Sequence, residues 1–439
     1  MLYTFIWKAI AQLKDSMLKG IFKNRFAKNV FMIAGGAAFA QVISLLLSPV
    51  ITRIYSPEEF STLTLFISIL GIICLLGTLS YESAIPIAAN DNKAINLLLL
   101  SFIILCLITF LLTVTIFLFS DFLLLILNAT DLVNYKYFIV LGFFMTGLYA
   151  ILTEWALRKK NYKGIARTKY SQSIIGNGGK IAFGFMGFGP IGLILGQILG
   201  QSAGIINLYI SFSKERRSLL KNFDLLSIWW CAKRYVRFPK YSAPTLFIIS
   251  LTSQLPVFFL SAFYNPETVG YYGLALTITF LPMGIIGKSV EDVFYGEVAS
   301  LGKSNAIAIK KISRSLLKKL SIIGAIPMII LILLGPELFV IVFGENWNNA
   351  GVFASVLAIY AYSHFIFQPI SMVFFVFEEQ HLQLYLNITK IVLVIIVFYM
   401  ANTLDLSAVL AIQIFSITMG CAEFCKYLLA QYVINKHTS

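Results

Sequence analysis

Apolar runs of about 20 residues, broken by short polar segments, recur along this whole chain. A helix of about 20 apolar residues spans the hydrocarbon core of a bilayer. The composition agrees, because 59% of the 439 residues are hydrophobic and only 12% are charged. A soluble protein with so few polar groups could not cover its own surface with them. The sequence therefore predicts an all-α polytopic membrane protein.

The hydrophobic pattern predicts twelve membrane spans, whose ends are set to within a few residues. They cover residues 29–51, 61–86, 95–119, 136–157, 170–188, 190–212, 242–262, 269–290, 319–343, 352–376, 385–401 and 406–430. Segments rich in Lys and Arg separate some of these spans, at 158–169, 213–241 and 291–318. With the N-terminus inside the cell these segments are cytoplasmic, and of the 34 Lys and Arg only Arg53 and Lys136 lie outside. Because basic loops stay on the cytoplasmic side, we expect both termini to be cytoplasmic.

Residues 1–28 are expected to form an amphipathic helix on the cytoplasmic membrane surface. Apolar residues recur there at helical spacing, and Lys8 and Lys14 interrupt the apolar core that a signal peptide would need. The other predicted units follow from the spans. They are an N-terminal six-helix bundle (29–212), a basic cytoplasmic linker (213–241), a C-terminal six-helix bundle (242–430) and a cytoplasmic tail (431–439).

Two pairs of similar segments indicate an internal repeat. YSPEEFSTLTLFISI (55–69) follows the first span and YNPETVGYYGLALTI (264–278) follows the seventh. Likewise, SDFLLLILN (120–128) precedes the fourth span and PELFVIVFG (336–344) precedes the tenth. Since each pair is six spans apart, an even number, we expect two bundles of the same orientation, related by an axis along the membrane normal. Transporters with this architecture bind their ligands between the two halves.

Several motifs, in this order along the chain, resemble the oligosaccharide flippase family, the Wzx-type O-antigen translocases. They are SPVITRIYSPEEFSTLTLF (48–66), GPIGLILGQILG (189–200), FPKYSAP (238–244), QLP (254–256) and VGYY (269–272). The resemblance extends over about residues 29–430. It implies a fold of the multidrug/oligosaccharidyl-lipid/polysaccharide (MOP) superfamily, related to MATE and MurJ, with two six-helix bundles around a central cavity.

The resemblance also implies a function, that of a flippase and not an enzyme. The implied substrate is an undecaprenyl-pyrophosphate-linked oligosaccharide repeat unit of the O-antigen type, moved from the cytoplasmic to the periplasmic leaflet of the bacterial inner membrane by alternating access. Expected partners are membrane lipids, a polysaccharide polymerase and its chain-length regulator, with H⁺ or Na⁺ if transport is ion-coupled. No cofactor, metal or nucleic acid is expected.

Two other functions stay open on the sequence. A MATE-like drug/cation antiporter would want acidic residues deep in the cavity, whereas the deepest charge here is a lysine. A membrane glycan polymerase or glycosyltransferase would want catalytic residues on a large outer loop, and the predicted outer loops are short. The polymerase or glycosyltransferase alternative also leaves the internal repeat unexplained.

Lys180 is the first candidate for binding the pyrophosphate, because unpaired charge is very unfavourable in hydrocarbon. It lies about ten residues into the fifth span, roughly 15 Å from the span's start at helical rise. Its helix face carries small and polar residues such as Ser173 and Asn177, whereas Ile174 and Ile175 point elsewhere. Such a face should contact protein or water. The alternative is a structural lysine paired with a carboxylate of a neighbouring helix.

Three other cations are candidates for the pyrophosphate. Arg53 lies at the outer end of the first span, and Lys240 and Lys288 lie at the inner ends of the seventh and eighth. The alternative for Arg53 is a salt bridge with Glu58 or Glu59. The alternative for both lysines is ordinary anchoring at the cytoplasmic surface.

Polar residues within the spans are candidates for binding sugar, although such residues also bridge helices in membranes. They are Gln41, Ser44, Asn177, Thr252 and Gln254. Glu82 and Glu154 are candidates for ion coupling; alternatively they, like Glu423, are counter-ions near the cytoplasmic ends of their helices. Lys390, near the start of the eleventh span, is expected to reach the interface with its side chain.

The stretch 187–192 matches the G-x-G-x-x-G pattern of a dinucleotide-binding loop. That pattern needs a preceding β-strand and a soluble nucleotide-binding fold, and here membrane spans flank it. We therefore predict a tight turn between the fifth and sixth spans.

Overall fold

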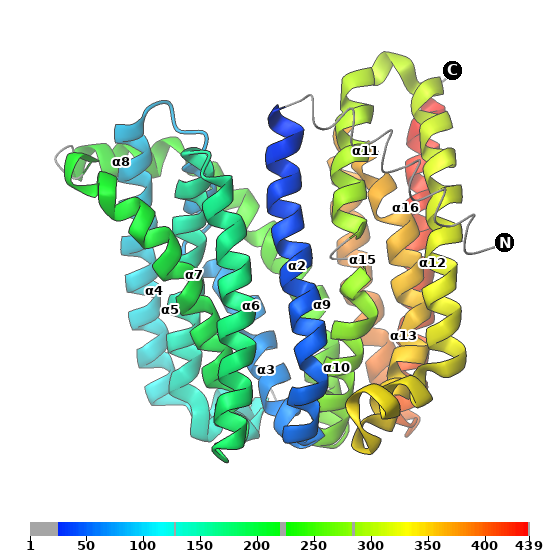
Figure 1. Cartoon of the computed structure of the whole chain (residues 1–439). Helices are drawn as coiled ribbons and strands as arrows, with labels where there is room; N and C mark the ends of the chain where they lie inside the picture. The colour runs from blue at the N-terminus through cyan, green and yellow to red at the C-terminus, as the bar shows by residue number, and fades with distance from the viewer. Residues whose placement is uncertain (1–24, 127–128, 220–224, 283–285, 438–439) are drawn as a thin grey trace.

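The computed structural model describes residues 25–126, 129–219, 225–282 and 286–437 (Figure 1). The helix expected for residues 1–28 lies outside these residues, apart from its last four. The N-terminal half contains α2 (Arg25–Ile54), α3 (Pro57–Ile73), α4 (Asp91–Ile126), α5 (Lys136–Arg158), α6 (Tyr162–Phe185) and α7 (Pro190–Leu219). The C-terminal half contains α9 (Ala243–Phe263), α10 (Pro266–Pro282), α12 (Ala306–Phe343), α13 (Asn348–Phe367), α15 (Gln380–Thr403) and α16 (Ala408–Lys436).

These helices confirm an all-α polytopic fold of two six-helix bundles. Ten helical segments in the described residues are long and apolar enough to cross a membrane. The other two expected spans are α6 and α10. At about 1.5 Å per residue, the 24 residues of α6 are long enough to span a bilayer. Its polar and glycine residues, however, make α6 less apolar than the ten helical segments above.

Three predicted spans are wrong in detail, because each continues past the point where its helix ends. Helix α3 ends at Ile73, and Ser80 beyond it is left-handed (φ 60°). Helix α10 ends at Pro282, and the short helix α11 begins at Lys288. Helix α13 ends at Phe367, just before a 3₁₀ turn at Pro369–Met372. Prolines lie at the ends of α10 and α13, where they restrict the preceding residue and lack an N–H donor, whereas tight turns with positive φ at Leu79 and Ser80 follow α3. An apolar run can therefore persist where the helix stops.

Two segments predicted as basic loops are largely helical. Within 213–241, α7 continues to Leu219 and a separate helix, α8 (Leu225–Arg234), precedes a π-helical turn at Phe238–Ser242. Within 291–318, α11 (Lys288–Leu301) is followed closely by α12. A further short helix, α14 (Val373–Val376), precedes α15. Short charged helices lack the long apolar run on which the prediction of spans depends.

The two ends of the molecule differ in chemistry. We call the end with the connections 55–56, 186–189 and 344–347 the turn end; it lies at the bottom of Figure 1. We call the opposite end, which carries Lys159 and Lys303, the basic end. At the turn end, Gly187 and Gly189 have positive φ values (74° and 58°), so the predicted tight turn is confirmed.

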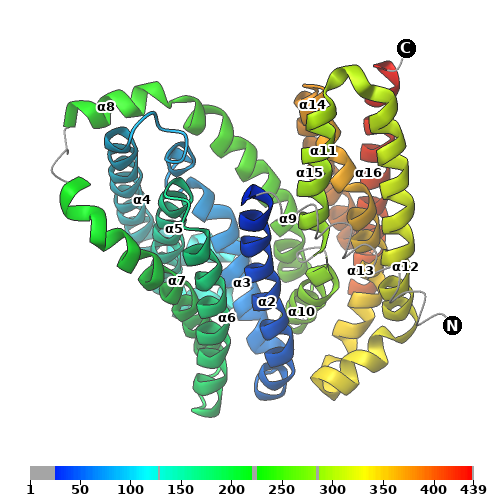
Figure 2. The ribbon, with the colours of Figure 1, turned by 45° about the horizontal axis from the view of Figure 1, so that its top comes forward.

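The two halves contact each other at the turn end and diverge towards the basic end (Figure 2). Helix α10 crosses α3 so closely that a methyl group on Gly270 would lie 1.9 Å from the carbonyl oxygen of Pro57. Trp347, which follows α12, donates its indole N–H to the carbonyl of Thr52 in α2 (2.8 Å). Its ring also packs edge-on against Phe60 of α3. These contacts close the turn end.

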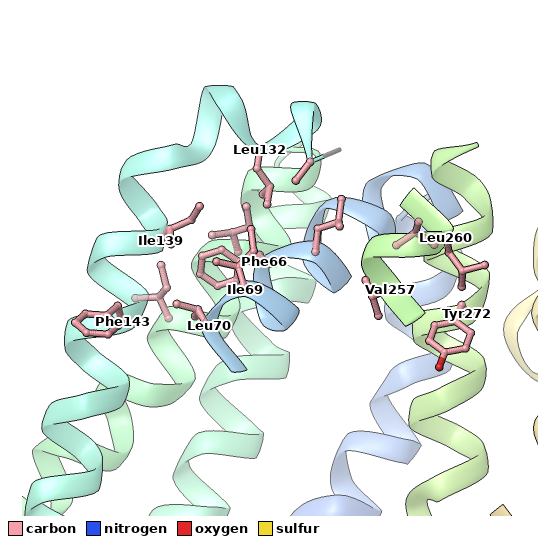
Figure 3. Close-up of a cluster of buried hydrophobic side chains, with 14 of the residues drawn as sticks. Phe66, Ile69, Leu70, Leu132, Ile139, Phe143, Val257, Leu260 and Tyr272 are labelled. Carbon is pink, nitrogen blue, oxygen red and sulfur yellow. The ribbon is translucent and has the colours of Figure 1, made fainter. Parts of the chain in front are cut away.

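Helix α3 also connects the halves through its apolar side chains. Figure 3 shows Phe66 and Leu70 beside Phe143 of α5, with Val257 and Leu260 of α9 beyond them. All of these side chains are buried. The second helix of the N-terminal half is therefore shared between both cores.

The repeat predicted at 55–69 and 264–278 has a structural counterpart. Pro57 begins α3 and Pro266 begins α10. The tyrosine before each helix donates its hydroxyl to a backbone carbonyl of its own half: Tyr55 to Lys180 (2.7 Å) and Tyr264 to Leu406 (2.9 Å). The same device fixes the start of the second helix in both bundles.

Candidate functional site

A stripe of glycines on α7 brings it close to α6. Glycine occurs at every fourth position from 192 to 204, which places these residues on one helix face. A methyl group on Gly196 would lie 2.4 Å from Cγ and 2.7 Å from the backbone N of Lys180. The stem of Lys180 therefore runs across bare backbone of α7, as small residues permit at membrane helix contacts.

The ammonium of Lys180 has a neutral partner. Its Nζ donates to Oε1 of Gln197, one position beyond Gly196 (3.0 Å). Within the described residues no carboxylate lies within 4.0 Å of Nζ, so an ion pair with a neighbouring helix, the alternative considered from the sequence, is not seen there. Ile174 and Ile175 are 54% and 46% exposed, as expected for a lipid-facing side of α6.

Lys180 lies on the wall between two cavities. The first, of about 330 Å³, lies within the N-terminal half among α2, α6 and α7. The second, of about 280 Å³, lies between the halves and adds residues of α3 and α10. Both are lined by Ser44, Asn177, Lys180 and Gln197. Among the described residues, neither cavity is lined by Asp or Glu.

Uncharged polar groups form most of the first cavity's wall. Ser173 donates to the carbonyl of Ala40 (2.8 Å), and Asn177 donates to Oγ of Ser44 (2.9 Å), so α2 and α6 are linked side by side. Oε1 of Gln41 is buried there without a hydrogen-bond partner among the described atoms. These hydrogen bonds hold the polar wall of the cavity in place, and Oε1 of Gln41 is a buried acceptor that they leave unsatisfied.

Four of the residues predicted from the sequence meet at this site: Lys180, Gln41, Ser44 and Asn177. Sequence reasoning missed several others. Gln172 and Gln201, joined by a hydrogen bond of 3.1 Å, line the first cavity with Lys169, and Gln197 contacts Lys180. The four-residue spacing of Gln197 and Gln201, beside the glycine stripe, is the signal that could have found them.

The other predicted cations lie elsewhere. Arg53 is exposed at the turn end, where it donates to the carbonyl of Ile341 in α12 (3.5 Å). Lys288 is paired with Glu291 (3.0 Å) and Asp292 (3.1 Å) at the start of α11. Lys240 is exposed in the π-helical turn before α9. None of the three lines the Lys180 cavities.

Thr252, Gln254, Glu82 and Glu154 are also outside these cavities. The hydroxyl of Thr252 donates to the carbonyl of Ile248 within α9 (2.8 Å). Gln254 lies against Gly71 of α3, at the contact between the halves. Glu82 accepts a hydrogen bond from Thr78 in the turns after α3, which pack against α5, the helix of Glu154.

The C-terminal half has a buried ionic cluster of its own. Glu423 of α16 is fully buried and accepts from Nζ of Lys390 (2.6 Å) and contacts Nζ of Lys426. Nδ1 of His364 lies 3.1 Å from the same carboxylate, and Lys426 also donates to Oε1 of Gln368 (2.6 Å). Lys390 is only 8% exposed, so the expectation that it reaches the interface is wrong.

A sequence profile of the family described as "Polysaccharide biosynthesis protein" matches residues 50–352, well over half of the chain. The chain belongs to this family. An inward-facing multidrug resistance MATE transporter of the MOP superfamily is 17% identical, with a TM-score of 0.68 over 91% of this chain and 95% of that one. The lipid II flippase MurJ, in an inward closed conformation, is 13% identical, with a TM-score of 0.70 over 93% and 90%.

An outward-facing MATE transporter of the same superfamily is 16% identical, with a TM-score of 0.59 over 94% and 96%. No curated protein sequence matches the chain. At these identities the solved structures establish the fold, which is of the MOP type. Family and fold together agree with the resemblance to oligosaccharide flippases, and they identify a multi-pass membrane protein of this polysaccharide biosynthesis family with a MOP-type fold.

Proposed function

We propose that this family member is a flippase for undecaprenyl-pyrophosphate-linked oligosaccharide repeat units of the O-antigen type. It would move them from the cytoplasmic to the periplasmic leaflet of the bacterial inner membrane by alternating access. The observation that carries the proposal is the environment of Lys180. A cation at membrane depth faces two cavities and has only a neutral amide as its partner in the described residues.

Such a cation suits a pyrophosphate. An unpaired charge within a membrane is unfavourable, so its retention at a cavity is best explained by an anion that it receives. Gln197 can hold the ammonium in place without neutralising it, whereas a carboxylate would compete with the substrate. Lys169, which lines the basic-end side of the first cavity, is placed for the earlier contact with the head group.

The neutral wall suits a sugar chain. Amides and hydroxyls both donate and accept hydrogen bonds, as sugar hydroxyls require. Gln201 lies about one turn from Gln197 and Gln172 about two turns from Lys180, and the amide of Gln41 lines the same cavity. Oligosaccharide attached to the pyrophosphate would therefore extend along α6 and α7.

The arrangement of the halves suits loading from the cytoplasm. Basic loops favour the cytoplasmic side, so we assign the basic end to the cytoplasm and both termini with it. The halves touch at the turn end and diverge towards the basic end (Figure 2), which corresponds to a state open to the cytoplasm. Coupling of H⁺ or Na⁺ by Glu82 and Glu154, and cooperation with a polymerase and chain-length regulator, remain parts of this proposal.

The cavity lining disfavours a MATE-like cation antiporter as the alternative. A cationic drug would need a carboxylate or an aromatic cage, and the lining residues of the first cavity include neither. Lys180 would repel it. We therefore do not extend the drug specificity of the MATE relatives to this chain.

The test is complementation of a strain that lacks the gene. Lys180→Ala should abolish surface polysaccharide while the protein still accumulates in the membrane, and Lys180→Arg should restore part of it. Lys163→Ala is the matched control, because it removes the same charge from an exposed position at the start of α6. Normal polysaccharide in Lys180→Ala would refute the site.

The substrate class has its own test. Deletion of the gene should trap undecaprenyl-linked single repeat units on the cytoplasmic leaflet. A polymerase defect would instead leave single units exposed at the cell surface, and that result would refute the flippase.

A further inference from the structure

Helix α8, which leads from the N-terminal to the C-terminal half, has two different faces. Ile228 and Cys231 are buried against α4, and Cys231 Sγ lies 3.8 Å from the carbonyl of Lys93. Burial raises the pKa of the Cys231 thiol, which marks it as part of a packed contact. On the opposite face, Leu226 is 78% and Trp229 is 63% exposed.

The exposed face combines aromatic rings with cations. Lys233 Nζ lies 5.0 Å from the ring centre of Trp229, and Lys93 Nζ lies 4.1 Å from that of Trp230. Arg234 and Arg237 are also exposed beside them. Residues 225–242 contain no Asp or Glu. The face is therefore purely cationic as well as apolar.

The position of α8 coincides with the edge of the membrane. Lys93 lies in the first turn of α4, and α4 begins a segment apolar enough to cross a bilayer at Asp91. Figure 2 shows α8 lying across this end of α4, at the periphery of the N-terminal half. The hydroxyl of Tyr81 fixes it further by donating to the carbonyl of Ala232 (3.0 Å).

We propose that the exposed face of α8 lies in the lipid headgroup region at the basic end and binds anionic phospholipid through Lys233, Arg234 and Arg237. Tryptophan prefers the interface between headgroups and acyl chains, and clustered Lys and Arg attract anionic headgroups. Anionic lipid is the favoured occupant because the positive charge of the face, its tryptophan rings and its position at the membrane edge all suit a lipid headgroup. A cytoplasmic protein would explain the charge but not the depth of the helix.

This contact would act on the connection between the halves. Only eight residues, 235–242, separate α8 from α9, and five of them form the π-helical turn at Phe238–Ser242. With α8 held at the membrane surface, the start of α9 is held at a fixed depth. The inference does not depend on which substrate the cavity carries.

The first test uses the full-length protein in nanodiscs with brominated phospholipids. The chain has five tryptophans, so the difference in fluorescence between the parent and Trp229→Phe isolates Trp229. Bromine near the headgroups should quench this signal roughly twofold more than bromine near the bilayer centre. Quenching by aqueous acrylamide with none by bromolipid would overturn the proposal, and a protein partner would then be the better explanation for the face.

The second test removes the charges with Lys233→Gln/Arg234→Gln/Arg237→Gln. The control is Lys310→Gln/Lys311→Gln/Arg314→Gln, which removes three charges from the beginning of α12. Native mass spectrometry would measure phosphatidylglycerol retained on each purified protein. We expect retention to fall at least tenfold in the α8 variant and little in the control, with phosphatidylcholine unaffected in both. An equal fall in both variants, or no fall in the α8 variant, would overturn the proposal.

Discussion

Lysines within the membrane-spanning helices of the two halves have different kinds of partner. In the C-terminal half, Lys390 and Lys426 share the buried carboxylate of Glu423 and are almost inaccessible. In the N-terminal half, Lys180 has a neutral amide as partner and lines two cavities. The difference shows that a charged residue within the membrane indicates a ligand only when its counter-charge is missing. The C-terminal cluster joins helices, whereas we propose that Lys180 receives a substrate.

The strongest test of this contrast is Glu423→Gln. It would leave two buried ammonium groups without a counter-ion, which costs about 3–5 kcal/mol of stability. We expect thermal unfolding in detergent roughly 3–5 °C below that of the parent, because the unfolding entropy of so long a chain is large. The triple variant Lys390→Met/Glu423→Leu/Lys426→Met should recover most of the loss, since apolar replacement of a whole ionic cluster is often neutral. An unchanged melting temperature in Glu423→Gln would show that the cluster is not structural.

Gly196→Ala tests whether the glycine stripe positions Lys180. The added methyl group would collide with the backbone N of Lys180 as well as its stem, so rotation of the side chain alone cannot relieve it. We expect a destabilisation of about 1–3 kcal/mol and a fall in flipping. Gly178→Ala is the control, because nothing lies within 4 Å of its added methyl group. Equal effects of both substitutions would point to helix propensity and not to the contact.

Gln197→Glu would convert the Lys180 site into the kind found in the C-terminal half. The new carboxylate would pair with Lys180 and compete with pyrophosphate, so transport should fall about tenfold, equivalent to ~1.4 kcal/mol. The melting temperature should not fall. Gln197→Ala leaves the lysine unpaired and should retain most transport. If Gln197→Ala and Gln197→Glu lower transport equally, transport depends on the amide of Gln197 and not on the added charge.

The smallest expected effect concerns the repeated tyrosines. Tyr55→Phe and Tyr264→Phe each remove one hydroxyl-to-carbonyl hydrogen bond, worth about 1 kcal/mol. Both should lower the melting temperature by a similar, small amount. Only Tyr55→Phe should change transport, because its acceptor is the backbone of Lys180. A transport defect of equal size in Tyr264→Phe would mean that the two halves contribute alike.

The sequence predicted which polar residues lie together beside Lys180, because local periodicity determines their arrangement. Ser173, Asn177 and Lys180 share a face of one helix, and helical spacing alone reveals this. The C-terminal cluster was missed because its members come from α13, α15 and α16, and only tertiary packing brings them together. The three-residue spacing of Glu423 and Lys426 was the one local signal.

In the fold, too, local sequence patterns predicted some features, and others depend on tertiary packing. Long apolar runs located most of the twelve helices, whereas helix ends at Ile73 and Pro282 depend on turns that hydropathy does not register. The sequence predicted a loop in place of α8 because this helix is only ten residues long and only one of its faces is apolar. The contact of Gly270 with Pro57 joins helices more than 200 residues apart, and no local pattern predicts it.

The burial of Trp347 affects how often ions and small solutes could leak through the turn end. It is 1% exposed and held by Thr52 and Phe60 of the opposite half. A buried Trp removes about 150–250 Å² from water, so separating it from roughly half of that contact costs about 2–3 kcal/mol. An empty protein would then have its turn end open only about 1% of the time. In the alternating-access cycle proposed here, substrate binding would supply this free energy, and a protein without substrate would rarely open a path for ions and small solutes.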